Sequence, residues 1–251
     1  MFAVICVPFF DTPENDRAEK GTIACLTHLL ENIRPPHVVI PVDNGSTDKR
    51  GSDFAMANFE HFIEIEHPLS ISEGVNSGWH LFHDALMAGD AIAIKHDSDL
   101  VTSPDNWVDK IVTFFESDPD IYLVGPRHFN VNYSTHRIVT RDYGHYYDCS
   151  FLFGGVQARS TECFKRIGYA RQPYGKWGFG DHWDSWRVKY LKKRIVTLKN
   201  VVFDELVGHS ALSEEEKKQH QERARQSLMK LQRRVSSGAI DIYQEFTGCL
   251  L

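Results

Sequence analysis

The stretch Ala91-Ile-Ala-Ile-Lys95-His96-Asp97-Ser98-Asp99 joins a short apolar run to two acidic residues one position apart. A continuous apolar run of this length is typical of a parallel strand that is buried on both faces. In open α/β sheets, ligands bind beyond the carboxyl ends of such strands. Two carboxylates at that end can hold a hard divalent cation, which prefers oxygen ligands. A solvent-exposed loop before a helix is the alternative interpretation.

Apolar runs alternate with helical patterns on both sides of this stretch. Further strands are expected at Phe2–Val7, Val38–Val42, Phe62–Glu66 and Ile121–Val124. Helices are expected at Glu14–Ile33, at Ser72–Ala88, and after Ser103, which would be the N-cap with Pro104 in the first turn. Such β-α alternation predicts a mostly parallel sheet flanked by helices.

The C-terminal third is less regular. The segment from His128 to Ser150 could hold antiparallel strands or an acceptor-facing loop. Helices are expected at Ser160–Ile167 and Asp181–Leu191, short strands at Ile195–Leu198 and Val201–Phe203, and a charged helix at Ser213–Val235 with a Ser213–Glu216 capping box. We therefore expect an α/β domain over 1–212 and a helical extension over 213–251, whose apolar end docks on this chain or on a partner.

The 251 residues are 42% hydrophobic and 25% charged, which predicts a folded protein. Five widely spaced cysteines without a CxxC pair argue against a disulfide framework or zinc site, so a reducing compartment is expected. No apolar stretch approaches the roughly 20 residues of a membrane span, and the N-terminus lacks the basic region of a signal peptide. These features predict a soluble cytoplasmic protein. The net charge of −6 neither requires nor excludes a polyanionic partner.

A polar turn, Asp43-Asn-Gly-Ser-Thr-Asp48, follows the expected strand at Val38–Val42. Asn-Gly is a turn signal and Thr47 or Asp48 could cap a helix, so the turn has a purely structural interpretation. In the functional interpretation, Asp43 accepts a hydrogen bond from a nucleobase.

The segment Trp177-Gly-Phe-Gly-Asp181-His-Trp-Asp184 combines glycines, aromatic rings and acids. Glycines allow a ligand to approach the backbone, and Trp177 and Phe179 could stack on the apolar face of a sugar. Asp181 and Asp184 are candidate general bases, because a carboxylate can take the proton of an attacking hydroxyl. An aromatic-rich loop with Asp181 as a helix N-cap is the structural alternative.

The order of these segments resembles that of the family 2 glycosyltransferases and related GT-A enzymes over roughly residues 2–209. The matching motifs are Val7-Pro8-Phe9, Asp43–Asp48, Gly74-Val-Asn76-Ser-Gly78, Gly89-Asp90, Asp97-Ser98-Asp99, Pro104, Val124-Gly-Pro126, Gly154-Gly155 with Arg159, Asp181–Asp184 and His209. Each motif is weak alone, but so many in one order favour the resemblance.

The resemblance implies a GT-A (Rossmann-like) fold with a mostly parallel central sheet and Mn²⁺ or Mg²⁺ as cofactor. It implies that the metal ligands are Asp97, Asp99 and His209. The implied donor-nucleotide site is Pro8, Phe9, Asp43, Asn76, Asp97 and Ser98. The implied sugar and acceptor pocket is Gly154, Gly155, Trp177, Gly178 and Phe179.

One motif departs from the family pattern, which usually has Glu-Asp in the catalytic loop with the Asp as base. Here the pair reads Asp181-His182, followed by Trp183-Asp184. If Asp181-His182 is aligned directly with the family's Glu-Asp pair, the base is His182. If the alignment is shifted by one residue, the base is Asp181. We expect Asp181 to be the base, with His182 and Asp184 as alternatives. The stereochemical outcome, inversion in the family pattern, stays open.

The expected function is transfer of a sugar from a nucleotide-diphosphate donor, UDP-linked by expectation, to an acceptor hydroxyl. A nucleotidyltransferase is one alternative, although Pro8-Phe-Phe-Asp11 lacks the glycine- and lysine- or arginine-rich loop that such enzymes usually carry. A non-catalytic nucleotide-sugar-binding protein is the other. A saccharide or lipid-linked saccharide is the expected acceptor. Basic runs such as Arg223 to Arg234 are compatible with a modified nucleic-acid base as the acceptor, but this acceptor is less favoured. The C-terminal helix could form a homodimer.

Overall fold

Strand β1 (Phe2–Phe9) lies inside the sheet and is buried from Ala3 onward. It pairs in parallel with β2 (Val38–Asn44) on one side and β4 (Ala91–His96) on the other, and β3 (Ile63–Ile65) forms the edge beyond β2. The buried runs of valine, isoleucine and alanine that predicted parallel strands thus form the N-terminal half of the sheet. The computed structural model describes residues 1–13, 16–129, 131, 133, 138–173, 175, 180–207 and 214–249.

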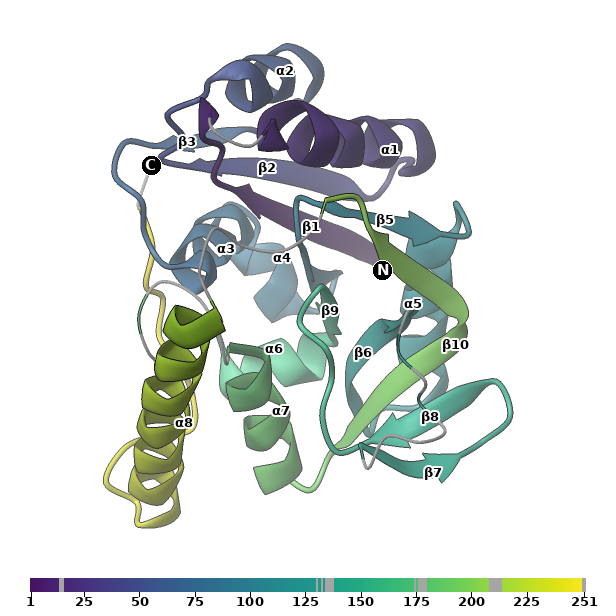
Figure 1. Cartoon of the computed structure of the whole chain (residues 1–251). Helices are drawn as coiled ribbons and strands as arrows, with labels where there is room; N and C mark the ends of the chain where they lie inside the picture. Colours follow the sequence, from purple (N-terminus) through teal and green to yellow (C-terminus); the bar gives the residue numbers. More distant parts are fainter. Residues whose placement is uncertain are drawn as a thin grey trace.

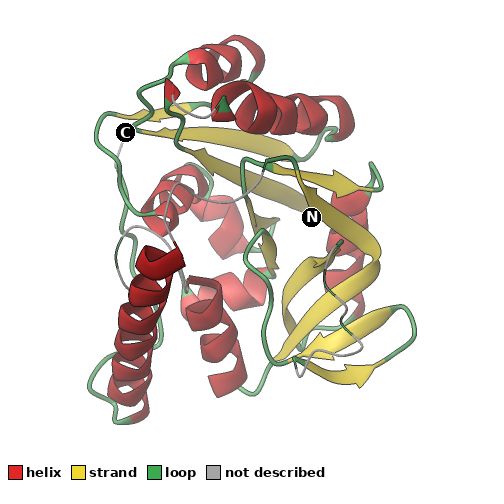
Figure 2. Ribbon diagram, in the orientation of Figure 1, coloured by secondary structure: helices red, strands yellow, loops and turns green. Residues whose placement is uncertain are grey.

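The other half of the sheet mixes parallel and antiparallel pairs (Figure 2). Strand β9 (Val156–Arg159) is antiparallel to both β4 and β6 (Ile121–His128), and β10 (Arg194–Glu205) is parallel to β6. The remaining strands are antiparallel additions around β10, namely β5 (Leu100–Ser103), β8 (Tyr146–Cys149) and, beyond β8, β7 (Val139–Asp142). The fold class is therefore α/β with a mostly parallel centre, as the sequence predicts.

Helices cover both faces of the sheet (Figure 1). Ala3, Ile5 and Val7 point to one apolar cluster, and Val4 and Cys6 point to the other, as the two-residue period of a strand requires. The first face carries η2 (Ala18–Ile23), α1 (Ala24–Asn32), α2 (Arg50–Asn58) and α5 (Trp107–Ser117). The second face carries α3 (Ile71–His80), α4 (His83–Ala88), α6 (Thr161–Ile167) and α7 (Gly180–Tyr190).

The C-terminal part of the chain packs on the second face. Helix α8 (Glu214–Ser236) buries Leu228, Leu231 and Val235 against Trp183 of α7. The segment after α8 then follows the outside of α3, where Ser77 Oγ accepts a hydrogen bond from the Cys249 amide at 2.9 Å. The apolar C-terminal end therefore docks on this chain, one of the two outcomes that the sequence leaves open.

Three sequence expectations need correction in detail. The helix expected at 72–88 is two helices with a break at Leu81–Phe82; the apolar period continues across the break, which is why one helix was expected. Ser103 is not an N-cap, because it pairs with Val202 as the last residue of β5. The two short strands expected at 195–203 are one strand, β10, with a register shift between Leu198 and Val202.

Other expectations are confirmed. Residues 139–149 form antiparallel strands, Cys6 and Cys25 are core residues, and all five cysteines are free thiols. The Ser213–Glu216 capping box includes Ser213, which lies outside the described residues. Among the helices that the structure describes, none combines the length and the apolar character needed to cross a bilayer.

Candidate functional site

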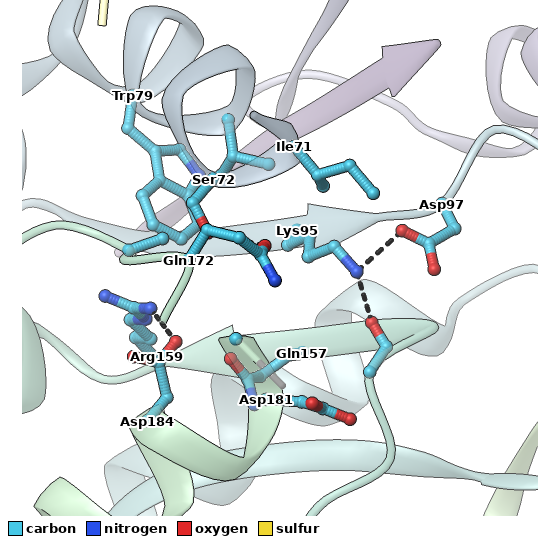
Figure 3. Close-up of a pocket in the computed structure, with 14 residues that line it drawn as sticks. Ile71, Ser72, Trp79, Lys95, Asp97, Gln157, Arg159, Gln172, Asp181 and Asp184 are labelled. Carbon is cyan, nitrogen blue, oxygen red and sulfur yellow. Dashed lines mark hydrogen bonds and ion pairs between the residues drawn. The ribbon is translucent and has the colours of Figure 1, made fainter. Parts of the chain in front are cut away.

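A pocket of about 210 Å³ lies beside the carboxyl end of β4 (Figure 3). Its walls come from segments far apart in the sequence: helix α3, the end of β4, strand β9 with the preceding Gly154, the segment with Ala170 and Gln172, and the start of α7. Lys95, Asp97, Gly154 and Asp181 all line it. The structure thus brings one acid of the Asp97–Asp99 pair and the candidate base Asp181 to the same cavity.

The Asp97–Asp99 turn is fixed at both ends by backbone hydrogen bonds. The Asp97 amide donates to the Gly155 carbonyl at 2.9 Å, and the Leu206 amide donates to the Asp99 carbonyl at 2.7 Å. The turn is therefore held between the segment leading into β9 and the end of β10.

Each acid of the turn contacts a cation of the chain. Lys95 Nζ lies 2.6 Å from Asp97 Oδ1, and Arg17 Nη2 lies 3.0 Å from Asp99 Oδ2. Burial raises the pKa of Asp97, an effect that Lys95 opposes and Asp99 reinforces. Binding of a divalent cation to both carboxylates would therefore share or displace these two ion pairs.

The side chain of His96 contacts the backbone of the turn. It is fully buried, with Nε2 3.1 Å from Thr102 Oγ1 and Nδ1 2.8 Å from the Asp97 carbonyl oxygen. Burial lowers the pKa of His96 to about 4, so the ring is neutral at physiological pH. A neutral ring adds no positive charge beneath the two carboxylates.

Gly154 and Gly155 have different surroundings. A Cβ added at Gly154 would lie 3.0 Å from Asp181 Oδ2, so this glycine allows the Asp181 carboxylate to reach the pocket. A Cβ added at Gly155 would lie 2.8 Å from both Leu100 and Phe203, so this glycine is required by core packing. Of these two glycines, both expected to help shape the sugar pocket, only Gly154 lines the cavity.

Asp181 lies in the first turn of α7 with its side chain 23% exposed. Its Oδ1 accepts a hydrogen bond from the His182 amide at 2.9 Å and lies 3.2 Å from His182 Nδ1. The His182 ring packs on Phe151, with ring centroids 4.1 Å apart, and is not among the residues that line the cavity. Oδ1 of Asp181 is therefore held by His182, and Oδ2 lies beside Gly154.

Asp184 forms a buried ion triad with Arg159 and Arg187. One carboxylate oxygen accepts from Arg159 Nη2 and the other accepts from Arg187 Nη2. Arg159 also donates to the Gly168 carbonyl at 2.7 Å and lies over the Trp79 ring at 4.8 Å. Because both oxygens of Asp184 are held by guanidinium groups, the geometry does not favour it as a base for a substrate hydroxyl.

The Asp43 carboxylate is also fully engaged within its own turn. Ser46 N donates to Oδ1 at 2.7 Å, while Ser52 Oγ and Lys49 Nζ donate to Oδ2. Burial alone would raise the pKa of Asp43, but these hydrogen bonds outweigh it and the pKa is lowered. The structural interpretation is therefore confirmed for the turn itself, although the N-cap of the next helix is Lys49 and not Thr47 or Asp48. A nucleobase would have to compete with Ser46, Ser52 or Lys49 for the Asp43 carboxylate.

Of the other candidate nucleotide residues, Asp97 lines the cavity, and Pro8, Phe9, Asn76 and Ser98 do not. Asn76 is fully buried and links α3 to two segments through hydrogen bonds with Ala170 and Thr247. Pro8, Phe9 and Ser98 are buried and do not line the cavity. Trp177, Gly178, Phe179 and His209 lie outside the described residues.

Lys95, Gln157, Arg159 and Gln172 line the cavity although the sequence suggested no ligand contact for them. A signal existed for the first three. Lys95 interrupts an otherwise apolar strand, and the run Val156-Gln-Ala-Arg159 alternates polar and apolar residues, which places Gln157 and Arg159 on one face.

The donor set at Asp97 and Asp99 suits Mn²⁺ or Mg²⁺ bound by two carboxylates, with further positions for phosphate oxygens and water. Among the described residues, no group of three or more His, Cys, Asp or Glu could hold a metal ion. A third ligand from the chain would therefore have to come from residues such as His209.

Known proteins match this chain in structure but not in sequence. No family model matches it, and no curated protein does. GalNAc-T7, solved with UDP, GalNAc and Mn²⁺, matches with a TM-score of 0.57 and 9% identity over 82% of this chain and 43% of its own. The Pyrobaculum calidifontis mannosyltransferase PcManGT, solved with GDP-Man and Mn²⁺, matches with a TM-score of 0.61 and 17% identity over 84% of this chain and 58% of its own.

A third match covers more of both chains. Glucosyl-3-phosphoglycerate synthase from Mycobacterium tuberculosis, solved with Mn²⁺, UDP-Glc and phosphoglyceric acid, has a TM-score of 0.57 and 16% identity over 94% of this chain and 80% of its own. The chain spans only about half the length of the first two proteins. These likenesses show the architecture, and the chain therefore has the GT-A glycosyltransferase fold.

Proposed function

We propose that the chain transfers a sugar from a nucleoside-diphosphate donor to an acceptor hydroxyl. We expect UDP to be the nucleotide of this donor. The observation that carries the proposal is the meeting of Asp97, Gly154 and Asp181 at one cavity beside the carboxyl end of β4. In a GT-A fold this edge of the sheet is where a ligand is expected. The structural neighbours solved with UDP-Glc or GDP-Man and Mn²⁺ support a sugar-nucleotide as that ligand.

Asp97 and Asp99 would hold Mn²⁺ or Mg²⁺, and His209 is the proposed further ligand. When bound, the cation would offset the negative charge of the diphosphate leaving group. Arg17 already lies against Asp99, so it can turn toward a phosphate oxygen as the cation takes its place, while Lys95 keeps its contact with Asp97.

Asp181 is the proposed base. Its Oδ1 is held by the His182 amide, while Oδ2 faces Gly154 and the cavity, where it can take the proton of an acceptor hydroxyl. His182 then orients Asp181. A single displacement of this kind inverts the anomeric centre.

The proposal also covers the domains, the assembly and the acceptor. We take residues 1–212 as the catalytic domain and 213–251 as an extension that closes the second face. A homodimer through α8 would have to use its exposed face, because Leu228, Leu231 and Val235 already pack on this chain. A saccharide or lipid-linked saccharide is the proposed acceptor class.

A donor screen tests the proposal. The protein is incubated with UDP- and GDP-linked sugars, with and without Mn²⁺, and the released nucleotide is measured. Release of UDP or GDP that depends on Mn²⁺ is expected. Release of pyrophosphate instead would support a nucleotidyltransferase, and the absence of any metal-dependent nucleotide binding would support a non-catalytic protein.

A further inference from the structure

Gln157 of β9 is buried without satisfying its side-chain amide. The residue is 3% exposed, and its Nε2 has no hydrogen-bond partner among the described residues. An unpaired buried N–H is energetically costly, so such groups in a folded protein call for an explanation. Gln157 lines the cavity, which places an unused donor in the cavity wall (Figure 3).

Lys95 lies next to Gln157 on the neighbouring strand. The two residues are direct partners in the β4–β9 register, so their side chains share one face of the sheet (Figure 3). Lys95 Nζ contacts the Gly154 carbonyl at 2.5 Å and Asp97 Oδ1 at 2.6 Å, and an ammonium has three protons to donate. The floor of the cavity thus presents two adjacent donors with hydrogens to spare.

Helix α3 contributes mostly apolar groups to the cavity, beside Ser72. Ile71, Val75 and Trp79 of α3 line it, and the indole nitrogen of Trp79 is already bonded to the Ile94 carbonyl. A cavity with donors on one side and apolar groups on the other suits a sugar ring, which has hydroxyl oxygens at its edge and C–H groups on its faces.

The charges of the cavity argue against an acidic sugar. Its two described cations are each paired with a carboxylate, Lys95 with Asp97 and Arg159 with Asp184. Asp181 adds a further carboxylate at the cavity. A sugar carboxylate would therefore find no unpaired cation among the described lining residues, and it would be desolvated beside Asp181.

We propose that Gln157 and Lys95 read the transferred sugar by donating hydrogen bonds to its hydroxyl oxygens, and that this sugar is uncharged. The proposal rests on the proposed function, since it assigns the cavity to the sugar of the nucleotide donor. Gln157 is then a specificity residue. Its amide lacks a partner in the free protein and gains one when the sugar binds.

Gln157→Met tests the assignment, because methionine has a similar length and no donor. Calorimetry with Mn²⁺ would compare wild type and variant with UDP, UDP-glucose, UDP-N-acetylglucosamine, UDP-glucuronate, GDP and GDP-mannose. We expect binding of the preferred uncharged donor to weaken about 3- to 10-fold, the effect of one hydrogen bond, while the free nucleotide binds as in wild type. The melting temperature should not fall, because the substitution removes an unpaired buried amide.

Gln226→Met on the exposed surface of α8 is the matched control and should leave every affinity unchanged. If Gln157→Met does not fold, Gln157→Asn, which keeps a shortened amide, should weaken the sugar-nucleotide and spare the free nucleotide in the same way. Equal losses for UDP and UDP-sugar, or no loss, would overturn the role of Gln157, and tighter binding of UDP-glucuronate than of the uncharged donors would overturn the charge assignment. Failure of wild type to bind any nucleotide would instead overturn the proposed function.

Discussion

Asp184→Asn tests whether Asp184 of α7 has a structural role, in contrast to Asp181, the proposed base. The Asp184 side chain is 4% exposed and those of Arg159 and Arg187 are 0% exposed, so the substitution leaves two buried guanidinium groups without a counter-charge. Breaking a buried ion pair by removing one partner costs about 3–5 kcal/mol. For a protein of this size, each kcal/mol lowers the melting temperature by about 2–4 °C, so we expect a fall of about 6–20 °C.

Thermal and urea unfolding of the Asp184→Asn variant measure this effect. Asp181→Asn is the matched control: it makes the same chemical change three residues earlier, at a partly exposed carboxylate whose described partner is His182. We expect the control to change stability by less than about 1 kcal/mol while it abolishes transfer. A loss below about 1 kcal/mol for Asp184→Asn would refute the structural role of the triad.

Three further substitutions test other parts of the structure. Burial raises the pKa of Asp11 to about 6. The stability that this group contributes is therefore present below its unfolded pKa of about 4 and is lost as pH rises through 6. In urea titrations between pH 4 and 7, the free energy of unfolding of Asp11→Asn should fall by about 3 kcal/mol less than that of wild type. In Gly154→Ala, the new methyl would press on Asp181, so kcat for sugar transfer should fall at least about 10-fold while calorimetry shows unchanged UDP binding. Gly78→Ala, which in an exposed helix would stabilise, should destabilise here by about 1–3 kcal/mol in urea unfolding, because its Cβ would lie 2.5 Å from Cys6 Sγ.

The N-terminal half of the fold was predictable because its signals are local. The apolar runs at β1, β2 and β4 are buried on both faces, so their composition alone identifies parallel strands. The antiparallel strands β5 and β9 were missed, because they are four residues long and their pairing partners lie far along the chain. No sequence window of ordinary length contains both members of such a pair.

The site was predictable where a motif carries its own chemistry and not where tertiary contacts decide. Asp97 and Asp181, the proposed metal ligand and the proposed base, both line the cavity. Asp184 has the same side chain as Asp181, and only the packing of Arg159 and Arg187 around it shows that its oxygens are taken. For Gln157 the sequence shows only that it shares a face with Arg159, because its importance comes from the partner that it lacks within the described structure.

Asp99→Ala, assayed for Mn²⁺-dependent release of nucleoside diphosphate from the best donor of the screen, tests the central claim most directly. Asp105→Ala is a control at an exposed acid six residues further on. We expect Asp99→Ala to lose at least about 100-fold in rate at saturating Mn²⁺, because one carboxylate of the metal site is removed, and the control to match wild type. A native rate for Asp99→Ala with Mn²⁺ would contradict the assignment of this turn as the metal-diphosphate site.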